Sequence, residues 1–552
     1  MSETITEMII PGTYIEVRAE GLIGVSGVAT GNVGMVGTAA KGPLDEVVVL
    51  SSFSDAREVF GDYDGWVDGN SSELTLVRAL QQAFANGAST VYAVRTGAAD
   101  TAGLSLPDGT GPVLRLVGRT PGTWAREISV SVKTATSNGF VEDRRQAVTA
   151  APLQPLHAGI APTPRNAVRI TRGATGKVVR LALATTGAPA KSRRAVVNPA
   201  DGVLTFHADD VPVAGDTLSA AYEVDKGACR LVEVKYRNIT ESYTAVDATD
   251  LKRDIGAAST LVNVEINAGA DARKPDVTTE ALLLDGGDDG ASADGGAYAT
   301  SLDKLAPEPI NIVLLAGRSF SDSIDSLKGH VESSESAGRD RIGVLGADAD
   351  SADTVAANAD SVASGRLILV APGIKVQDLA LGRQVTLPAA YAAAAIAGLI
   401  ASMSVQVSPT NKTLSVAGLS KDYNDGELKK LLGVRVMALE KKSGFRVVKG
   451  ITTDDGPFRQ VSVRRIVDFA KAGTRIGSLP YIGRLNNARV RGALKATLNG
   501  FLSDMVQDEK LIGFTLDVSA TRQQEIAGVA VVTMFLQPTF SIDYIKVIMN
   551  LS

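Results

Sequence analysis

A long uncharged stretch places the strongest constraint on how this chain can fold. Residues 384–411 carry no charged side chain, and alanine dominates the run 387–405. A stretch of this length and polarity must be buried, either in a membrane or in a protein core. Alanine gains little from transfer to hydrocarbon, and polar side chains such as Tyr391 and Ser402 are unfavourable among lipid tails. The sequence therefore predicts a tightly packed core helix with Pro388 in its first turn.

The composition excludes several classes of protein. The 552 residues include 56 Lys and Arg and 61 Asp and Glu, a net charge of -5, so no global positive charge supports direct nucleic-acid binding. Cys229 is the only cysteine, which excludes an intrachain disulfide and a thiol-based metal cluster and is typical of folding in a reducing cytoplasm. The first twelve residues, MSETITEMIIPG, lack the basic segment and apolar run of a secretory signal, so no signal peptide is expected.

The first hundred residues predict alternating strands and helices. Strands are expected at 14–18, 46–50 and 91–95. A helix between the last two strands would start at Asn70, with Glu73 in a capping box, and end at Gly87. The same alternation resumes with strands at 311–315 and 342–345 and a helix at 321–333 between them. The two α/β parts are therefore expected to share one sheet.

The composition changes between these two α/β parts. Prolines punctuate residues 152–164, and alternating segments follow at 168–170, 178–182 and 204–207, so residues 140–235 are predicted to form an inserted β domain. From residue 425 the chain predicts a capped helix, a hairpin with strands at 434–439 and 445–449, a long helical region and a β-rich tail. The apolar tail ends almost at the terminus, where chains usually fray, so something must hold it.

Residues that could support catalysis or bind a metal are scarce. His157, His207 and His330 are the only histidines, and none has a serine or carboxylate at a familiar catalytic spacing. They are interpreted as ordinary surface or packing residues. The glycines at 31, 34 and 37 lack the unequal spacing of a dinucleotide-binding motif and are interpreted as bends in an extended chain. The sequence predicts no catalytic residue and no cofactor.

Two acidic runs also fail to form a metal-binding pattern. Residues 285–289 have glycine at a ligand position and no glutamate at the twelfth position of a calcium loop, and residues 348–353 are similar. Polar turns and helix caps explain both runs. No metal site is therefore predicted.

A series of short motifs extends over nearly the whole chain outside the predicted inserted domain. They are PGTY at 11–14, GMVGTAAKGP at 34–43, LSSFSDAREVFG at 50–61, FANGA at 84–88, VYAVR at 91–95, PGTW at 121–124, LDGGDDG at 284–290, PTNK at 409–412 and VRRIVDF at 463–469. In this order they resemble the contractile phage tail sheath proteins, including the sheaths of phage-derived contractile injection systems. The segment LPYIGRLNN at 479–487 departs from the pattern, because many members have a Phe-Glu-Pro-Asn-like segment there.

The resemblance implies a multidomain α/β and α+β protein. The domains that it implies are an N-terminal arm (1–25) that pairs with the C-terminal domain, a subtilisin-like α/β middle domain without a catalytic triad (26–139 and 236–384), the inserted outer β domain (140–235), a C-terminal α+β assembly domain (385–527) and a C-terminal β arm (528–552). Fold alone carries no function, so the middle domain is expected to be a scaffold.

The resemblance also implies a structural role and no enzymatic activity. Subunits would stack as hexameric rings around an inner tube and contract to drive the tube through a target envelope. Expected partners are further copies of the chain, the inner tube protein, and baseplate and tail-terminator proteins, with no membrane and no direct nucleic acid. The expected location is a virion or contractile particle assembled in the bacterial host cytoplasm. Two alternatives remain: another tail or baseplate structural protein, and a subtilisin-like hydrolase.

The terminal arms are predicted to exchange strands between subunits. An apolar strand with unpaired edges is an aggregation hazard unless the sheet of a neighbour covers it. The alternative is that residues 542–551 complete a sheet of their own domain. The proposed strand-exchange residues are Tyr14, Ile15, Val17, Ile542, Tyr544, Ile545, Val547 and Ile548.

A helix predicted at 487–507 carries its charges in an unfavourable order. Basic residues occupy its N-terminal half and acidic residues follow its C-terminal end, and each opposes the helix dipole at a cost of ~0.3–1 kcal/mol. Local stability does not explain this order. The basic residues are therefore interpreted as contacts to the inner tube or to another subunit, with a solvated helix face as the alternative. They are Arg484, Arg489, Arg491 and Lys495.

Overall fold

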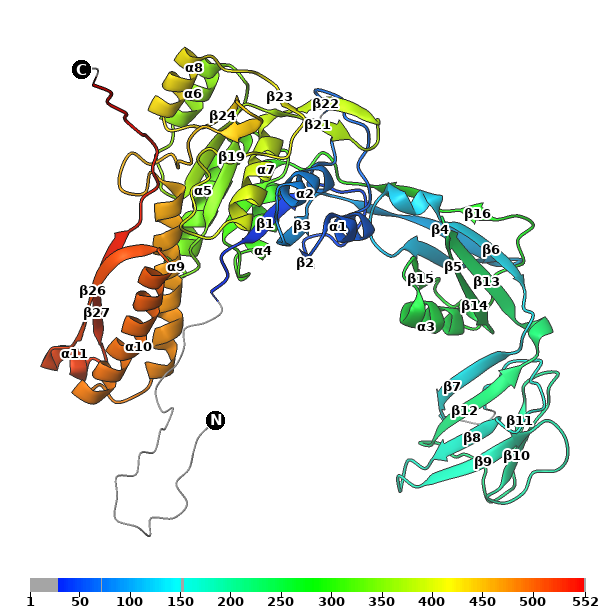
Figure 1. The fold of residues 1–552 in the computed structure, drawn as a ribbon. Coiled ribbons are helices and arrows are strands. Elements are labelled where there is room, and N and C mark those ends of the chain that lie inside the picture. Colours follow the sequence, from blue (N-terminus) through cyan, green and yellow to red (C-terminus); the bar gives the residue numbers. More distant parts are fainter. Residues whose placement is uncertain (1–27, 71, 150–152, 551–552) are drawn as a thin grey trace, which may run out of the picture. The chain divides into compact units, whose positions relative to one another are not determined.

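A computed structural model describes residues 28–70, 72–149 and 153–550. The chain forms two compact units. Unit 1 contains the described residues up to Gly97 and from Ala291 onward, and unit 2 contains Ala98–Gly290. Both units combine helices with β-sheets (Figure 1), so the predicted mixture of α/β and α+β structure is confirmed.

Unit 1 is built around an eight-stranded sheet. In spatial order its strands are β2 (Val47–Leu50), β3 (Thr90–Arg95), β1 (Asn32–Gly37), β18 (Ile312–Leu315), β19 (Ile342–Gly346), β20 (Leu367–Ala371), β24 (Met437–Lys441) and β25 (Phe445–Val447). β1 pairs in parallel with both β3 and β18, so segments far apart in the sequence share one sheet, as predicted. β18, β19 and β20 are buried along their whole length, as expected for parallel strands covered on both faces.

Helices cover the two faces of this sheet with separate cores. Side chains of α1 (Phe53–Phe60), α2 (Thr75–Ala85) and α7 (Ala389–Ser402) share one core with Val33, Ile312 and Leu314. The opposite core contains Val36, Val313 and residues of the remaining helices. These are α4 (Gly295–Lys304), α5 (Phe320–Ser336), α6 (Ala352–Asp360) and α8 (Asp425–Gly433). The alternation of side chains along β1 and β18 therefore sends successive residues into different cores.

The uncharged stretch forms the helix α7, and α7 lies in the protein core as predicted. Every residue from Ala389 to Ile400 except Leu399 is buried, and Pro388 precedes the first turn. A Cβ atom added at Gly398 would lie 2.1 Å from the carbonyl oxygen of Ala83, so α2 and α7 approach each other too closely for any side chain there. Within the described part of the chain, no helix combines the length and apolarity that a membrane crossing needs.

The glycines at 34 and 37 are not bends, because both lie inside the buried strand β1. A Cβ atom at Gly34 would lie 2.5 Å from Ile310 Cδ1, and one at Gly37 would lie 2.8 Å from Ala316 Cβ. Close packing on the sheet therefore requires glycine at these positions. The predicted start of α2 is also wrong. The helix begins at Thr75 without a side-chain cap, because Glu73 accepts a hydrogen bond from the buried Arg78 instead, with Nε and Oε1 2.7 Å apart.

Two further elements complete unit 1. A small sheet consists of β22 (Arg383–Leu387), β21 (Ile374–Asp378) and β23 (Gly418–Leu419). A C-terminal module follows, with α9 (Val461–Ser478), α10 (Ala488–Gln507), β26 (Leu511–Ser519), α11 (Arg522–Ile526) and β27 (Val531–Pro538). The boundary predicted at residue 385 cuts through one packed body, because α7, β24 and β25 belong to the eight-stranded sheet and its core.

Unit 2 contains three antiparallel or mixed sheets. Two four-stranded sheets pack with α3 (Ala248–Ala258) around one core. Their strands are β4 (Asp100–Asp108), β5 (Gly111–Gly118), β6 (Ser129–Thr134), β13 (Arg230–Tyr236), β14 (Ile239–Ala245), β15 (Val262–Ile266), β16 (Leu282–Leu283) and β17 (Asp285–Asp288). A six-stranded sheet has its own core and consists of β7 (Gly139–Ala147), β8 (Ala167–Thr171), β9 (Val178–Ala184), β10 (Arg194–Val197), β11 (Leu204–Thr205) and β12 (Thr217–Val224).

The six-stranded sheet falls almost entirely within the predicted inserted β domain, 140–235, but the compact unit is larger than that range. Residues 98–139 and 236–290, which were predicted to belong to the middle domain, supply every strand of the two four-stranded sheets of unit 2 except β13. The prolines and alternating segments from which the boundary was inferred mark only the nested sheet. The ordinary composition of the flanking strands gave no signal that they leave the α/β sheet.

Candidate assembly surfaces

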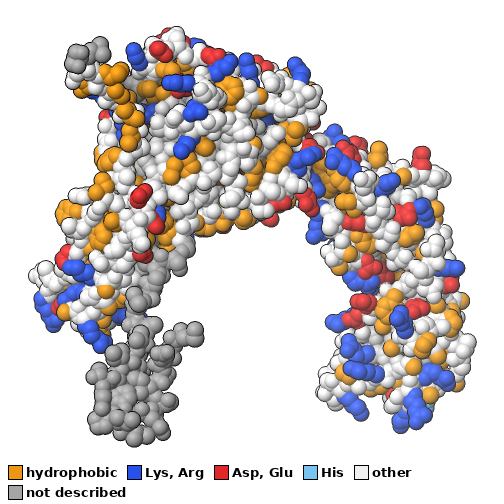
Figure 2. Space-filling view, in the orientation of Figure 1, with side chains coloured by type: hydrophobic (Ala, Val, Ile, Leu, Met, Phe, Trp, Pro, Cys, Tyr) orange, Lys and Arg blue, Asp and Glu red, His pale blue; other side chains and the backbone are white. Residues whose placement is uncertain are grey.

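The C-terminal segment after β27 exposes a run of large apolar side chains. Residues 539–550 form neither helix nor strand, and between 71% and 85% of each side chain in the run is exposed. These residues are Ile542, Tyr544, Ile545, Val547, Ile548 and Met549. Figure 2 shows hydrophobic side chains along this end of the chain. Burying one such side chain is worth ~1.5–3 kcal/mol, so the isolated chain leaves considerable stabilisation unused here.

Polar contacts hold only the beginning of this segment. Lys449 Nζ lies 3.1 Å from Asp543 Oδ2 and donates to Tyr544 OH at 3.2 Å. The Gln460 side chain donates to Asp543 at 3.2 Å and accepts from the backbone nitrogen of Ser541 at 3.3 Å. Residues 545–550 make no side-chain hydrogen bond or ion pair with any described residue. The predicted β arm, 528–552, is therefore divided: β27 pairs with β26, and residues 539–550 have no strand partner among the described residues.

The hairpin formed by β26 and β27 has open edges. Among the described residues these two strands pair only with each other. One face of the hairpin packs on α9 and α10 through Phe514, Leu516 and Met534, and the other face leaves Phe535 71% exposed. A two-stranded sheet is marginal alone, and unpaired strand edges are the usual acceptors of an added strand.

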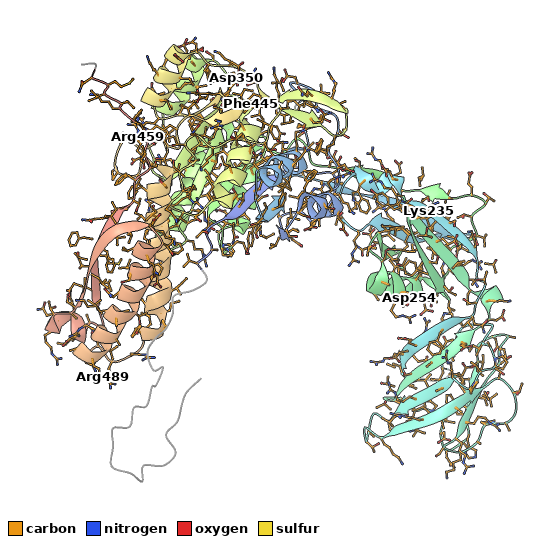
Figure 3. All side chains as sticks on the ribbon, viewed as in Figure 1. Lys235, Asp254, Asp350, Phe445, Arg459 and Arg489 are labelled. Atoms are coloured by element: carbon orange, nitrogen blue, oxygen red, sulfur yellow. The ribbon has the colours of Figure 1, made fainter. Side chains whose placement is uncertain are left out.

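The four basic residues singled out near α10 fall into two groups. Arg491 Nη1 lies 3.0 Å from Glu525 Oε1, and Lys495 Nζ lies 3.3 Å from Asp517 Oδ1, so both pair with the hairpin side of their own module. Arg484 stacks over the Tyr481 ring at 5.5 Å, and Arg489 is exposed at the N-terminal end of α10 (Figure 3). The structure thus places all four on one module, but only Arg484 and Arg489 have guanidinium groups without a carboxylate partner in its described residues.

An exposed apolar tip, which was not predicted from the sequence, adjoins these arginines. Ile482 and Leu485 lie in the LPYIGRLNN segment, and the side chain of the adjacent Asn486 donates to the Val529 carbonyl at 2.9 Å. Ile526, in α11 of the same module, is 76% exposed. The sequence offered one signal for this tip, namely large apolar residues in a segment rich in Gly and Asn. A loop on its own rarely buries such residues.

The predicted arm residues Tyr14, Ile15 and Val17 lie outside the described residues. A buried arginine holds the residues just before β1 in place. Arg465, in the VRRIVDF motif, is almost fully buried and donates to the carbonyl oxygens of Thr30 at 3.0 Å, Met403 at 2.9 Å and Ser404 at 3.3 Å. Burial lowers the pKa of Arg465 to about 10. One motif residue therefore fixes the start of β1 against α9.

A charge network joins α9 to the α/β part of unit 1. Arg366 reaches Glu335 at 2.5 Å, Asp340 at 2.7 Å and Asp468 at 3.0 Å. Lys471 and Arg475 of α9 also bind the buried Asp340.

Hydrogen bonds from Arg366 and Lys471 lower the pKa of Glu335 to about 2 although partial burial opposes this. Burial would raise the pKa of Asp340, but hydrogen bonds from Lys471 and Arg475 outweigh it and lower that pKa. Burial raises the pKa of Asp468 despite its cationic neighbours. Charge-assisted hydrogen bonds thus connect α5, the residues after it, the residue before β20 and α9.

The histidines do not form a catalytic arrangement. His157 Nε2 lies 2.8 Å from Asp247 Oδ2, and Tyr222 OH, not a serine, contacts Nδ1 at 2.6 Å. His330 Nε2 lies 2.9 Å from Arg341 Nη1, and burial together with Arg341 lowers the pKa of His330 to about 4. In the described ranges no serine hydroxyl contacts a histidine ring. The His157–Asp247 contact joins residues 90 positions apart, so spacing in the sequence could not reveal it.

Local turn contacts, the predicted role, account for only part of the acidic runs. Asp288 accepts from the Gly290 nitrogen at 2.7 Å, but other residues of the two runs accept from segments that are distant in the sequence. Asp289 accepts hydrogen bonds from the backbone and hydroxyl of Thr123, and Asp348 accepts from the backbone of Ser321 at the start of α5. Asp350 accepts from the Gly373 nitrogen at 3.0 Å. Across the described residues no group of three or more His, Cys, Asp or Glu side chains is arranged to hold a metal ion.

Comparison with known proteins identifies the C-terminal half of the chain. Residues 291–453 match the family described as phage tail sheath protein central domain, and residues 453–552 match the phage tail sheath C-terminal domain. The tail sheath protein of Bacillus phage SP01 is 27% identical over 285 residues, which are 50% of this chain and 48% of that protein. The chain therefore spans about half the length of the curated relative that it matches.

Two solved structures share the fold. The sheath tail protein from Desulfitobacterium hafniense superposes with a TM-score of 0.56 at 15% identity, covering 96% of this chain and 100% of the other. A sheath tail protein from Listeria innocua gives a TM-score of 0.59 at 13% identity, covering 94% and 93%. The two matched domains adjoin each other and contain α9, the hairpin and the terminal segment. Residues 291–552 of this chain thus match the central and C-terminal domains of phage tail sheath proteins, which are structural proteins and not enzymes.

Proposed function

We propose that this chain is the subunit of a contractile tail sheath, which polymerises as stacked hexameric rings around an inner tube and contracts to drive that tube through a target envelope. The observation that carries this proposal is the combination of an exposed apolar terminal segment, 545–550, with the open edges of β26 and β27. Each copy offers both an unpaired segment and an unpaired strand edge. Copies of the chain therefore complement one another, and repetition of one such contact builds a polymer.

The geometry of the terminal segment favours exchange over completion of its own sheet. Lys449 and Gln460 hold residues 541–544 against unit 1, and the segment beyond them has no strand partner among the described residues. Residues 545–550, fully extended, span about 20 Å at ~3.3 Å per residue, the length of an ordinary strand. Addition to the hairpin of a neighbour would satisfy the backbone groups of both partners and bury Ile545, Val547 and Ile548.

The remaining parts of the chain have supporting roles in this proposal. The N-terminal arm (1–25), including Tyr14, Ile15 and Val17, would link subunits in the same way. The eight-stranded sheet would be the subtilisin-like scaffold without a triad, and the six-stranded sheet within the predicted 140–235 domain would lie on the outside. Arg484, Arg489, Arg491 and Lys495 would contact the inner tube or a neighbouring subunit, with Arg484 and Arg489 free of carboxylate partners in the described module.

The mechanism needs no cofactor. Subunits would assemble in an extended, metastable lattice, and a baseplate trigger would release them into a shorter lattice with more buried contact. A few kcal/mol per subunit, summed over many subunits, would supply the work, while a kinetic barrier preserves the loaded state. The network around Arg366 supports this proposal because it ties the arm-bearing module firmly to the α/β part. Baseplate, tail-terminator and inner tube proteins are the proposed partners, in a virion or contractile particle assembled in the host cytoplasm.

Electron microscopy of the purified chain tests the proposal. The wild-type protein is expected to form striated tubes as the salt concentration rises, because salt screens charge repulsion and strengthens apolar burial. The double variant I545D/V547D places charges in the proposed exchanged strand and is expected to stay monomeric, with an unchanged unfolding temperature. The control V213D places a charge at a residue that is 59% exposed in unit 2 and is expected to polymerise normally.

Two results would contradict the proposal. Tubes formed by I545D/V547D would show that the terminal segment does not link subunits. Small closed oligomers of the wild-type chain, persisting when a tube protein is coexpressed, would instead indicate another tail or baseplate structural protein. Labelling by an active-site serine probe would indicate the hydrolase alternative.

A further inference from the structure

Two cationic side chains that have no role in the proposed function line an open cavity of about 490 Å³ in unit 2. Its walls come from the turn between β4 and β5, from residues 157–159, which lie beside the six-stranded sheet, and from the start of β13. Arg230 and Lys274 lie in these walls. We call this site the basic cavity.

Neither cation has a carboxylate partner among the described residues. Arg230 donates from Nε to the Pro275 carbonyl at 2.9 Å and from Nη1 to the Cys229 carbonyl at 3.4 Å. Lys274 donates from Nζ to the Ala228 carbonyl. Burial and the nearby Arg230 guanidinium lower the pKa of Lys274, so the two positive charges repel each other in a partly desolvated place. An uncompensated pair of this kind destabilises a protein unless an anion joins it.

Most of the other charged groups of the basic cavity are already engaged. Arg273 donates to Asp108 with Nε and Oδ2 2.9 Å apart, and the hydrogen bonds of Arg273 and Thr110 hold the pKa of Asp108 well below its usual range. Asp276 also lines the cavity, so the cavity walls carry two carboxylates against the three cations Arg230, Arg273 and Lys274. Both ring nitrogens of His157 are bound to Tyr222 and Asp247. The uncompensated charge of the cavity is therefore positive.

We propose that the basic cavity binds a small molecule with a phosphate or carboxylate group, held between Arg230 and Lys274. A guanidinium and an ammonium together bind such a group by charge-assisted hydrogen bonds. The volume is within the range of small-molecule sites and far exceeds that of a bare phosphate ion, so the ligand is of about the size of a sugar phosphate or sugar acid. The remainder of the ligand contacts the polar turn at 108–110 and the residues 157–159.

The site has a mechanical consequence within unit 2. Residues 157–159 belong to the segment next to the six-stranded sheet, whereas Arg230 and Lys274 belong with the four-stranded sheets. A ligand that touches both sides ties these sheets together. Ligand binding is therefore expected to raise the unfolding temperature of unit 2, and this outcome does not depend on whether the chain polymerises.

Thermal unfolding and calorimetry of the full-length protein test the proposal. The probes are inorganic phosphate, glucose 6-phosphate and glucuronate, with chloride at matched ionic strength and glucose as controls. At about ten times Kd, a specific ligand is expected to raise the unfolding temperature of a unit of this size by about 3–6 °C. A larger effect of glucose 6-phosphate than of phosphate identifies a phosphosugar, and a larger effect of glucuronate identifies a sugar acid.

Variants separate this site from general effects of salt. In K274Q the repulsion with Arg230 is removed, so the protein without ligand is expected to unfold at the same or a higher temperature, whereas ligand affinity falls by ~10-fold or more. R230Q is expected to lose affinity similarly. The matched control K226Q changes a lysine of the neighbouring 3-10 turn (Lys226–Ala228) that does not line the cavity, and it should bind like the wild type. The proposal is overturned if none of the anions raises the unfolding temperature at about 100 mM, or if the rise persists in R230Q/K274Q.

Discussion

The eight-stranded sheet and the β26–β27 hairpin, both in unit 1, differ in how completely one chain buries their side chains and pairs their strand edges. Strands β18, β19 and β20 are buried along their whole length, and helices cover both faces of their sheet. The hairpin has one covered face, open edges among the described residues, and an exposed apolar segment after it. The first region is fully packed within a single copy of the chain, whereas the second leaves strand edges and apolar side chains without a partner among the described residues.

This difference predicts that folding stability and association between copies depend on separate parts of the unit. Substitutions in the sheet region should change the free energy of unfolding of a single chain, because its contacts exist in that chain. If the proposed strand exchange is correct, substitutions in the hairpin and terminal segment should change association more than folding, because the exposed residues would be buried only between copies. The Arg366 network lies at the border, where α9 meets the α/β part.

Breaking that border network should have the largest effect. R366M leaves Glu335, Asp340 and Asp468 without their shared cation, and removal of one partner from such a buried network costs about 3–5 kcal/mol. The unfolding free energy, measured with urea, should fall by that amount. The control R491M breaks the Arg491–Glu525 pair of the C-terminal module and should cost no more than about 1 kcal/mol. Equal losses in both variants would contradict the comparison.

Acid should weaken the sheet region through His330. Burial holds its folded-state pKa at about 4, below the ordinary value of 6.5, so the unfolded chain takes up a proton first as pH falls. Stability contributed by neutral His330 is therefore complete above about pH 6.5 and is lost between pH 6.5 and 4, by about 3 kcal/mol in total.

The variant H330Q tests this assignment. Glutamine keeps an acceptor for Arg341 but does not titrate, so unfolding free energies measured from pH 7 to 4 should be flatter than in the wild type. An unchanged slope in H330Q would assign the pH dependence to other groups.

The sequence predicted regular elements better than their grouping into units. The strands β2, β3, β18 and β19 were predicted within a residue or two, because short apolar runs between turn signals are a local pattern. β1 was missed because Gly34 and Gly37 interrupt its apolar run, and the need for glycine comes from Ile310 and Ala316, which are distant in the sequence. The extent of unit 2 was missed for a related reason, since pairing between β6 and β13 leaves no local signal.

The candidate assembly surfaces were only partly predictable. The apolar terminal residues could be identified because Ile542, Ile545 and Val547 lie close together near the end of the chain. The pairing of Arg491 with Glu525 and of Lys495 with Asp517 could not, because it depends on how the hairpin folds back on α10. A charge pattern on one helix therefore predicted a functional surface of four residues, of which two have intramolecular partners.

Two helix glycines sharpen the comparison at the smallest scale. In α7, G398A places a methyl group 2.1 Å from the Ala83 carbonyl oxygen, so α2 and α7 must separate, at a cost of about 1–3 kcal/mol. In α10, G492A meets no atom within 4 Å and should stabilise the chain by about 0.5–1 kcal/mol, because alanine favours a helix over glycine. Urea unfolding of both variants measures the two effects. The same substitution should therefore lower the unfolding free energy in α7 and raise it in α10. The difference comes from packing, because α7 is enclosed in the core whereas the face of α10 at Gly492 is exposed. If G492A also abolished tube formation without loss of stability, that face of α10 would itself be an intersubunit contact. The proposed assembly surface would then extend from the hairpin onto the helix.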